Sequence, residues 1–132
     1  MSDKLSYEIV TPEALLSSAT ADQIVVPGME GDFGVLSGHA PFLSTIRPGV
    51  ISILGGPEGD QKLFVKGGLA QVAPEGLTIL AEESIPLDTV DRDDLSKSIA
   101  DTQAALAKAD DDTEKKRLSG ELAWMQALQA AV

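Results

Sequence analysis

Two carboxylates and the only histidine of the chain lie close together in a glycine-rich stretch. Glu30 and Asp32 flank Gly31, and His39 follows seven residues after Asp32. Carboxylates at a sharp turn can pair with an Arg or Lys of a partner, whereas a histidine can act as a general base. A Ser-His-Asp arrangement would have to use His39 within a Gly/Pro-rich turn, and the sequence has no G-x-S-x-G motif. We therefore favour a turn or interface role for His39 and expect no catalytic residue.

Nucleotide and metal signatures are also absent from the sequence. It has no G-x-x-x-x-G-K-[ST] phosphate loop, and its glycines do not follow G-x-G-x-x-G spacing. The acids between Asp110 and Glu121 imitate a calcium loop, but Lys115 stands where that loop needs glycine. A helix N-cap explains the same acids, and there is no cysteine for a thiolate site. We expect no cofactor, no bound metal and no nucleotide-binding residue.

The charge balance limits the class of partner. Asp and Glu number 21 against 10 Lys and Arg, giving a net charge of -11. This excess of negative charge argues against binding to nucleic acid or to anionic lipid headgroups. No apolar run approaches the roughly 20 residues that span a bilayer, and the N-terminus does not resemble a secretory signal. We expect no direct membrane insertion and a place of work in a bacterial-type cytoplasm.

The composition divides the chain near residue 87. All seven prolines and eleven of the twelve glycines lie before it. Short β-type runs alternate with turn residues in this part: residues 5–10, 23–26, 50–54, 61–65, 69–73 and 77–80. Gly67-Gly68 and Pro74-Glu75-Gly76 look like tight turns between neighbouring strands. Residues 1–87 are thus predicted to form a β-sandwich or barrel.

After residue 88 the apolar residues recur every three or four positions, which is the spacing of an α-helix. Leu95, Ile99, Thr102 and Leu106 form one stripe; Leu118, Leu122, Met125, Leu128 and Val132 form a second. Acids precede each stripe, where a helix N-terminus favours negative charge. Residues 88–132 are therefore predicted to be an antiparallel two-helix hairpin. About 40 residues cannot make a self-sufficient core, so the hairpin must pack on the β-domain or on another protein.

The stretch of residues 26–49 is the most distinctive part of the chain. Its glycines permit sharp turns, and Phe33, Leu36 and Phe42 are predicted to anchor a loop into the core. Glu30 and Asp32 would then project from a constrained tip. The alternative is an ordinary surface loop with solvated acids.

This stretch, V-P-G-M-E-G-D-F-G-V-L-S-G-H-A-P-F-L-S-T-I-R-P-G, resembles the signature region of the epsilon subunit of F-type ATP synthases. Residues 64–72 resemble that family's second segment, an aromatic residue followed by Gly-Gly and a strand. The resemblance extends over essentially the whole chain. It implies an N-terminal β-sandwich and a C-terminal helical hairpin in a non-catalytic subunit.

The resemblance also implies partners. The sandwich would bind the gamma subunit and the polar loops of the c-ring, so that proton-driven rotation reaches the catalytic head. Glu30, Gly31 and Asp32 would form the c-ring contact, with His39 close by. The subunit would then be peripheral to the bacterial inner membrane, on its cytoplasmic side.

In many bacterial members of that family the hairpin can extend along gamma and oppose ATP hydrolysis at the alpha and beta subunits. Lys115, Lys116 and Arg117 are the candidates for a beta-subunit contact; the alternative is that they are ordinary solvated residues. The hairpin is short and Val132 is not followed by a basic tail. We therefore expect a mainly structural coupling role.

Some family members bind ATP through a pattern like [IL]-D-x-x-R-A. Here Asp94 stands at the Arg position and Leu95 at the Ala position. An anion beside a triphosphate is repulsive, so ATP binding is predicted to be weak or absent. This disfavours the alternative function, a nucleotide-sensing regulatory module.

A carbohydrate binder or small β-sandwich enzyme would need more aromatic or convergent polar residues than this sequence has.

Overall fold

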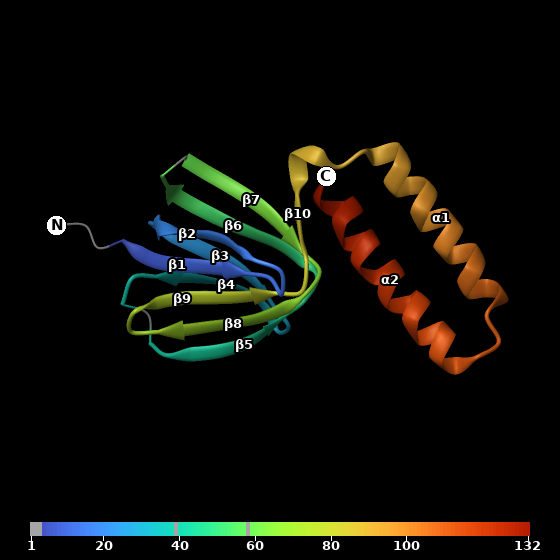
Figure 1. The fold of residues 1–132 in the computed structure, drawn as a ribbon, viewed down its shortest axis with the longest axis horizontal. Helices are drawn as coiled ribbons and strands as arrows, with labels where there is room; N and C mark the ends of the chain where they lie inside the picture. Colours follow the sequence, from blue (N-terminus) through green and yellow to red (C-terminus); the bar gives the residue numbers. More distant parts are fainter. Residues whose placement is uncertain (1–3, 39, 58) are drawn as a thin grey trace. The chain divides into compact units, whose positions relative to one another are not determined.

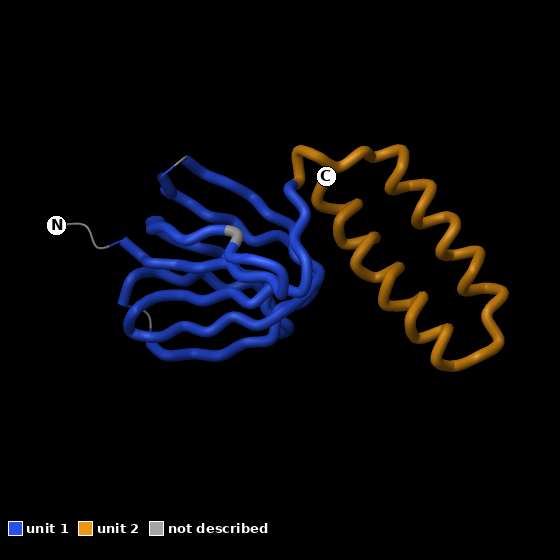
Figure 2. Tube along the Cα trace, viewed as in Figure 1, with its two compact units in different colours: residues 1–86 blue, residues 87–132 orange. Residues whose placement is uncertain are grey.

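The computed structural model describes residues 4–38, 40–57 and 59–132. The protein forms two compact units, residues 1–86 and residues 87–132 (Figure 2). The boundary predicted from composition lies one residue later, after residue 87. Strands make up the first unit, and helices make up the second (Figure 1).

Within the described residues the first unit contains ten strands. They are β1 (Leu5–Val10), β2 (Leu15–Ala21), β3 (Gln23–Gly28), β4 (Gly31–Leu36), β5 (Phe42–Ile46), β6 (Gly49–Gly56), β7 (Gly59–Val65), β8 (Gly68–Ala73), β9 (Gly76–Ala81) and β10 (Ser84–Pro86). Hydrogen bonds join them in the order β10-β7-β6-β3-β5-β8-β9-β1-β2, and β4 pairs with β3 off this path. Only the β1–β9 pair is parallel among these pairings. The predicted β-sandwich followed by two helices is confirmed.

The core of this unit arises from alternation along the strands. In β1, Leu5, Tyr7 and Ile9 are buried, while Ser6 and Glu8 are exposed, because successive side chains of a strand point to opposite faces. Other strands supply further core residues: Ile24, Val26, Ile51, Ile53, Ala70, Val72, Leu77, Ile79 and Ala81. Complete burial of a large aliphatic side chain stabilises the fold by about 1.5–3 kcal/mol.

All six predicted strands exist, and the Pro74–Gly76 turn does join the antiparallel pair β8 and β9. The prediction for Gly67-Gly68 was wrong, because β7 and β8 do not pair with each other. β7 pairs with β6 and β10, whereas β8 pairs with β5 and β9. Both glycines have positive φ, +142° and +147°. They redirect the backbone from one pair of strands to another rather than closing a hairpin.

The second unit begins with a short 3-10 turn at Leu87–Thr89, followed by α1 (Arg92–Lys108) and α2 (Asp112–Ala131). The helices run antiparallel and contact each other (Figure 1). Their buried residues come from the two predicted stripes: Leu95, Ile99, Leu118, Met125 and Leu128. Asp91 and Asp111 are the N-caps. Neither helix is long and apolar enough to cross a membrane, over the part of the protein that the structure describes.

Candidate partner-binding site

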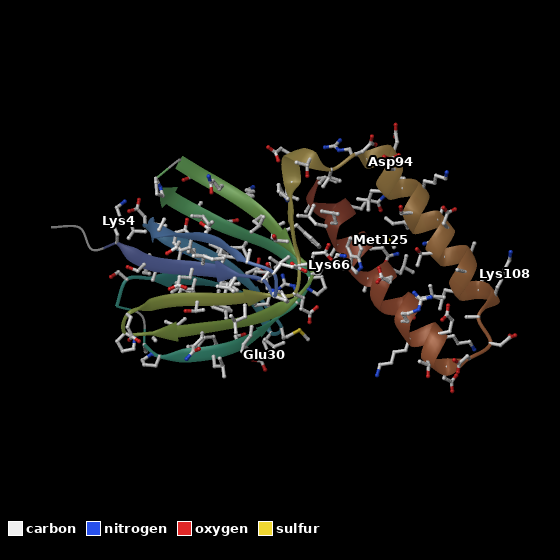
Figure 3. All side chains as sticks on the ribbon, viewed as in Figure 1. Lys4, Glu30, Lys66, Asp94, Lys108 and Met125 are labelled. Atoms are coloured by element: carbon white, nitrogen blue, oxygen red, sulfur yellow. The ribbon has the colours of Figure 1, made fainter. Side chains whose placement is uncertain are left out.

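Glu30 lies in a tight turn that joins β3 to β4. Gly28 pairs with Gly31 across the hairpin, so Met29 and Glu30 alone form the turn. Gly31 has φ +135°, a conformation that favours glycine. A Cβ on Gly28 would lie 2.8 Å from the Gly31 carbonyl oxygen and 2.9 Å from the Phe33 ring. The two glycines therefore permit this close turn, which leaves Glu30 exposed at the edge of the β unit (Figure 3). We call residues 28–32 the acidic turn.

The side chain of Arg47 connects both sides of the acidic turn. Its Nη1 donates to the Gly28 carbonyl oxygen at 2.6 Å, and its Nη2 donates to Asp32 Oδ1 at 2.5 Å. The two charged side chains are 40% and 61% exposed. At such exposure an ion pair stabilises a fold by only about 0–1 kcal/mol. The greater effect is geometric, because one planar guanidinium fixes two points of the turn at once.

Backbone hydrogen bonds hold the same turn from its other edge. Met29 N–H donates to the Thr45 carbonyl at 3.0 Å, and Arg47 N–H donates to the Pro27 carbonyl at 2.9 Å. The end of β3 is thus bonded to β4 on one side and to the segment around β5 on the other. These bonds make the acidic turn a fixed part of the sheet rather than a free loop.

An open groove of about 600 Å³ lies beside the acidic turn. Residues 29–33 and 42–45 line it, and we call it the apolar groove because Met29, Phe33, Phe42 and Leu43 are among them. The rings of Phe33 and Phe42 meet edge to face, with centroids 5.2 Å apart. The carboxylates of the turn therefore border an apolar surface.

The structure corrects the predicted anchoring of this stretch. Phe33 packs partly buried against the core, as expected. Leu36 and Phe42 are 54% and 45% exposed, so the prediction that they anchor a loop into the core was wrong. Residues 31–36 form strand β4, and within the described residues this strand pairs only with β3. Successive side chains of a strand point to opposite faces, so in β4 Val35 is buried and Leu36 is exposed.

Three of the predicted contact residues, Glu30, Gly31 and Asp32, thus lie together on one turn. His39, the fourth, lies outside the described residues. Arg47 is the residue that sequence reasoning missed. Its position in the Arg-Pro-Gly end of the signature stretch was visible, but a pairing across 15 residues with Asp32 cannot be read from spacing.

The predicted cations of the hairpin lie exposed near the start of α2. Arg117 donates from Nη2 to Glu114 Oε1 at 2.6 Å. This hydrogen bond, together with the negative charge of Glu114, raises the pKa of Arg117 above its ordinary value. Neither Lys115 nor Lys116 has an ion pair within residues 4–38, 40–57 and 59–132. The two lysines are therefore the more available of the three cations.

The start of α1 is anionic. Asp91 Oδ1 accepts hydrogen bonds from the backbone N–H groups of Asp93 at 2.9 Å and Asp94 at 3.1 Å. Asp94 is exposed in this first turn. Among the described residues, no three His, Asp or Glu side chains gather as a metal site. The first turn of α1 thus carries acidic side chains.

Each of the two units matches a model of a known protein family. Residues 4–86 match the family model described as "ATP synthase, Delta/Epsilon chain, beta-sandwich domain". Residues 91–132 match the model for the C-terminal domain of the ATP synthase epsilon chain. The fold is thus that of the delta/epsilon class of ATP synthase chains, a β-sandwich followed by a helical hairpin.

The most similar relatives identify the family within this class of ATP synthase chains. The protein is 42% identical over 130 residues to the ATP synthase epsilon chain of Maricaulis maris, an alignment that spans 98% of this chain and 97% of the relative. It is 47% identical over 113 residues to that of Parvibaculum lavamentivorans, spanning 84% and 86%. The chain belongs to the ATP synthase epsilon chain family, and the resemblance noted in the sequence is confirmed.

Two solved structures share the fold. A subunit in the cryo-EM structure of the Euglena gracilis mitochondrial ATP synthase, titled OSCP/F1/c-ring, superposes with TM-score 0.84 at 22% identity, covering 97% of this chain and 81% of that one. A subunit in the Tetrahymena thermophila mitochondrial ATP synthase, titled central stalk/c-ring, gives TM-score 0.74 at 18% identity, covering 98% and 96%. At these identities the likeness concerns the fold alone.

Proposed function

We propose that this chain is a central-stalk rotor subunit that binds the gamma subunit and the polar loops of the c-ring. It would pass proton-driven rotation of the ring to the catalytic head and would have no active site of its own. The observation that carries the proposal is the acidic turn, with the Glu30 carboxylate exposed on a turn that is bonded on both edges. The proposed partners, gamma and the c-ring, are those that the resemblance to the family implies.

Transmission of torque requires a contact that does not bend under load. The side chain of Arg47 and the two backbone bonds to the segment around β5 constrain the acidic turn. A single exposed ion pair contributes only about 0–1 kcal/mol. The contact with the ring therefore needs apolar area or further pairs besides Glu30.

The proposed place of this protein follows from its partners. A subunit bound to gamma and to c-ring loops lies at the surface of the membrane, attached through other proteins. The named relatives are bacterial. We therefore assign it to the cytoplasmic side of a bacterial inner membrane, peripheral to the bilayer.

The hairpin is a second contact in this proposal, with the alpha and beta subunits. Lys115 and Lys116 are its candidate residues for an acidic surface of beta, and Arg117 contributes less because Glu114 already pairs with it. We expect this contact to be mainly structural. Deletion of residues 90–132 should leave the ATPase rate of the assembled head nearly unchanged. A large rise in that rate would instead make the hairpin an inhibitor.

The experiment that tests the proposal is a pull-down from detergent-solubilised membranes. The wild-type protein should recover gamma and the other ATP synthase subunits. The double variant Glu30→Lys/Asp32→Lys should still recover gamma but retain less c-ring, because the charge is reversed at the proposed contact.

Glu75→Lys is the matched control, because it reverses an exposed acid on the β8–β9 turn. β8 starts at Gly68, which pairs with Ile46 beside the acidic turn, and it ends at the β8–β9 turn. Glu75 thus lies at the opposite end of β8 and should not affect c-ring retention. Failure of the wild-type protein to recover gamma would refute the proposed function.

A further inference from the structure

The last four strands of the β unit form one long, bent hairpin rather than two separate pairs. β8 pairs with β9 over its whole length, and the last three residues of β7 pair with β10. Two backbone hydrogen bonds of 3.0 Å join the residues between these ladders: the Glu82 N–H donates to the Gly67 carbonyl, and the Lys66 N–H donates to the Glu83 carbonyl. The same register thus continues from the β8–β9 turn to the end of β10.

An ion pair lies at the bend of this long hairpin, next to the start of β10. Lys66 Nζ and Glu83 Oε2 are 2.6 Å apart, and the two side chains are 21% and 58% exposed. Lys66 is labelled in Figure 3. Because the lysine side chain is mostly covered, water and salt screen this pair less than they screen a fully exposed one. The pair therefore joins the two arms of the hairpin where β10 leaves the bend.

β10 itself is held weakly. It is the shortest of the described strands and the last one before the helical unit (Figure 1). Within the described residues it pairs with β7 alone. None of its three residues is buried, whereas Phe64 and Val65 of β7 are fully buried. A short edge strand with little buried surface belongs to the parts of a fold that open at low free energy. The ion pair at its start is therefore a large share of what holds β10 on β7.

We propose that residues 83–86 are a releasable strap and that the Lys66–Glu83 ion pair is its lock. With the lock closed, the sheet holds the chain up to Pro86, and the linker to α1 begins at Leu87. When the pair breaks, the strap separates from β7 and becomes part of that linker. Four further residues lengthen the linker by up to roughly 13 Å. The opened strap thus extends the range that the helical hairpin can reach. This device belongs to the chain itself and does not depend on the partners proposed above.

Hydrogen exchange of the full-length protein, measured by mass spectrometry of its peptides, tests the lock. Glu83→Gln removes the charge and keeps the size of the side chain. Exchange in residues 84–90, which contain β10 and most of the linker, should become about two- to fivefold faster, the range of one partly exposed ion pair. Strands β1 and β9 and both helices should exchange at the wild-type rate, because the opening is local.

Glu82→Gln is the matched control. It neutralises the neighbouring exposed acid, which forms no ion pair within residues 4–38, 40–57 and 59–132. The two variants have the same net charge, but only Glu83→Gln loses the lock, so the control should exchange as the wild type does. Glu83→Lys places two like charges at the bend and should speed exchange of residues 84–90 further. At molar salt the difference between the wild type and Glu83→Gln should shrink, because ions screen the pair.

Three results would overturn the strap. Unchanged exchange of residues 84–90 in Glu83→Gln would mean that the ion pair does not hold β10. Equal acceleration in Glu82→Gln and Glu83→Gln would make net charge the cause instead of the pair. Equal acceleration in β1 and β9 would show a loss of stability of the whole sandwich rather than release of one strand. Recovery of gamma in the pull-down tests the proposed function separately, so none of these results affects it.

Discussion

Arg47 and Asp32 form an ion pair, with Nη2 and Oδ1 2.5 Å apart, although 15 residues separate them in the sequence. The same guanidinium donates to the carbonyl of Gly28 on the other side of the acidic turn. One side chain thus bridges the two sides of the turn and offsets the charge of Asp32.

Loss of Arg47 should cost more stability than loss of its partner Asp32. Asp32→Asn removes an exposed ion pair and should lower the free energy of unfolding by about 0–1 kcal/mol. Arg47→Ala also leaves the buried Gly28 carbonyl without its side-chain donor, which costs about 1–3 kcal/mol. Urea denaturation of both variants measures the difference. Equal losses would mean that the bond to Gly28 contributes nothing to stability.

Gly28 should tolerate alanine poorly, because its Cβ would lie 2.8 Å from a backbone oxygen. Overpacking of this kind destabilises by about 1–3 kcal/mol. Gly34→Ala in the same hairpin is the control, since its Cβ would meet only the flexible end of the Gln23 side chain. Thermal unfolding should show a lower Tm for Gly28→Ala than for Gly34→Ala. The reverse order would show that the turn can widen at little cost.

Ile79 and Leu80 are neighbours in β9 with opposite surroundings. Ile79 is fully buried, whereas Leu80 is 46% exposed. Ile79→Ala should lower the free energy of unfolding by about 2–5 kcal/mol through the lost contacts and the cavity. Leu80→Ala should change it by about 0.5 kcal/mol. Comparable losses for both would contradict the register of β9 in the sandwich.

ATP should not bind to this protein at low micromolar concentrations. Asp91, Asp93 and Asp94 place negative charge at the first turn of α1, and Asp94 takes the position of an arginine in the ATP-binding pattern. Isothermal titration of ATP into the full-length protein should therefore give no heat of binding. A low micromolar dissociation constant would restore the nucleotide-sensing function. Asp94→Arg is the companion variant, and any gain of affinity in it would identify Asp94 as the residue that excludes ATP.

The sequence correctly predicted the elements whose apolar periodicity matches the residues that are buried in the structure. The stripes of the hairpin, with Leu95 and Leu118 buried, follow from a helical period that needs no distant partner. The loop predicted within residues 26–49 was wrong, because that stretch contains β4 and β5. The predicted strands did not include β2 and β10. The β4 sequence, Gly-Asp-Phe-Gly-Val-Leu, contains two glycines, and this composition is typical of a loop. It forms a strand because β3 offers it a complete antiparallel partner.

The sequence by itself determined the two-part fold, the apolar periods and the place of Glu30 between two glycines. These depend on backbone freedom and on neighbours within a few residues. Only the tertiary structure decided that Arg47 balances Asp32 and leaves Glu30 unpaired among the described residues. It also decided that Met29 and Leu43 share a groove, although 14 residues separate them. Pairings of this kind depend on strand order and register, which arise from packing of the whole sheet and are not encoded in local spacing.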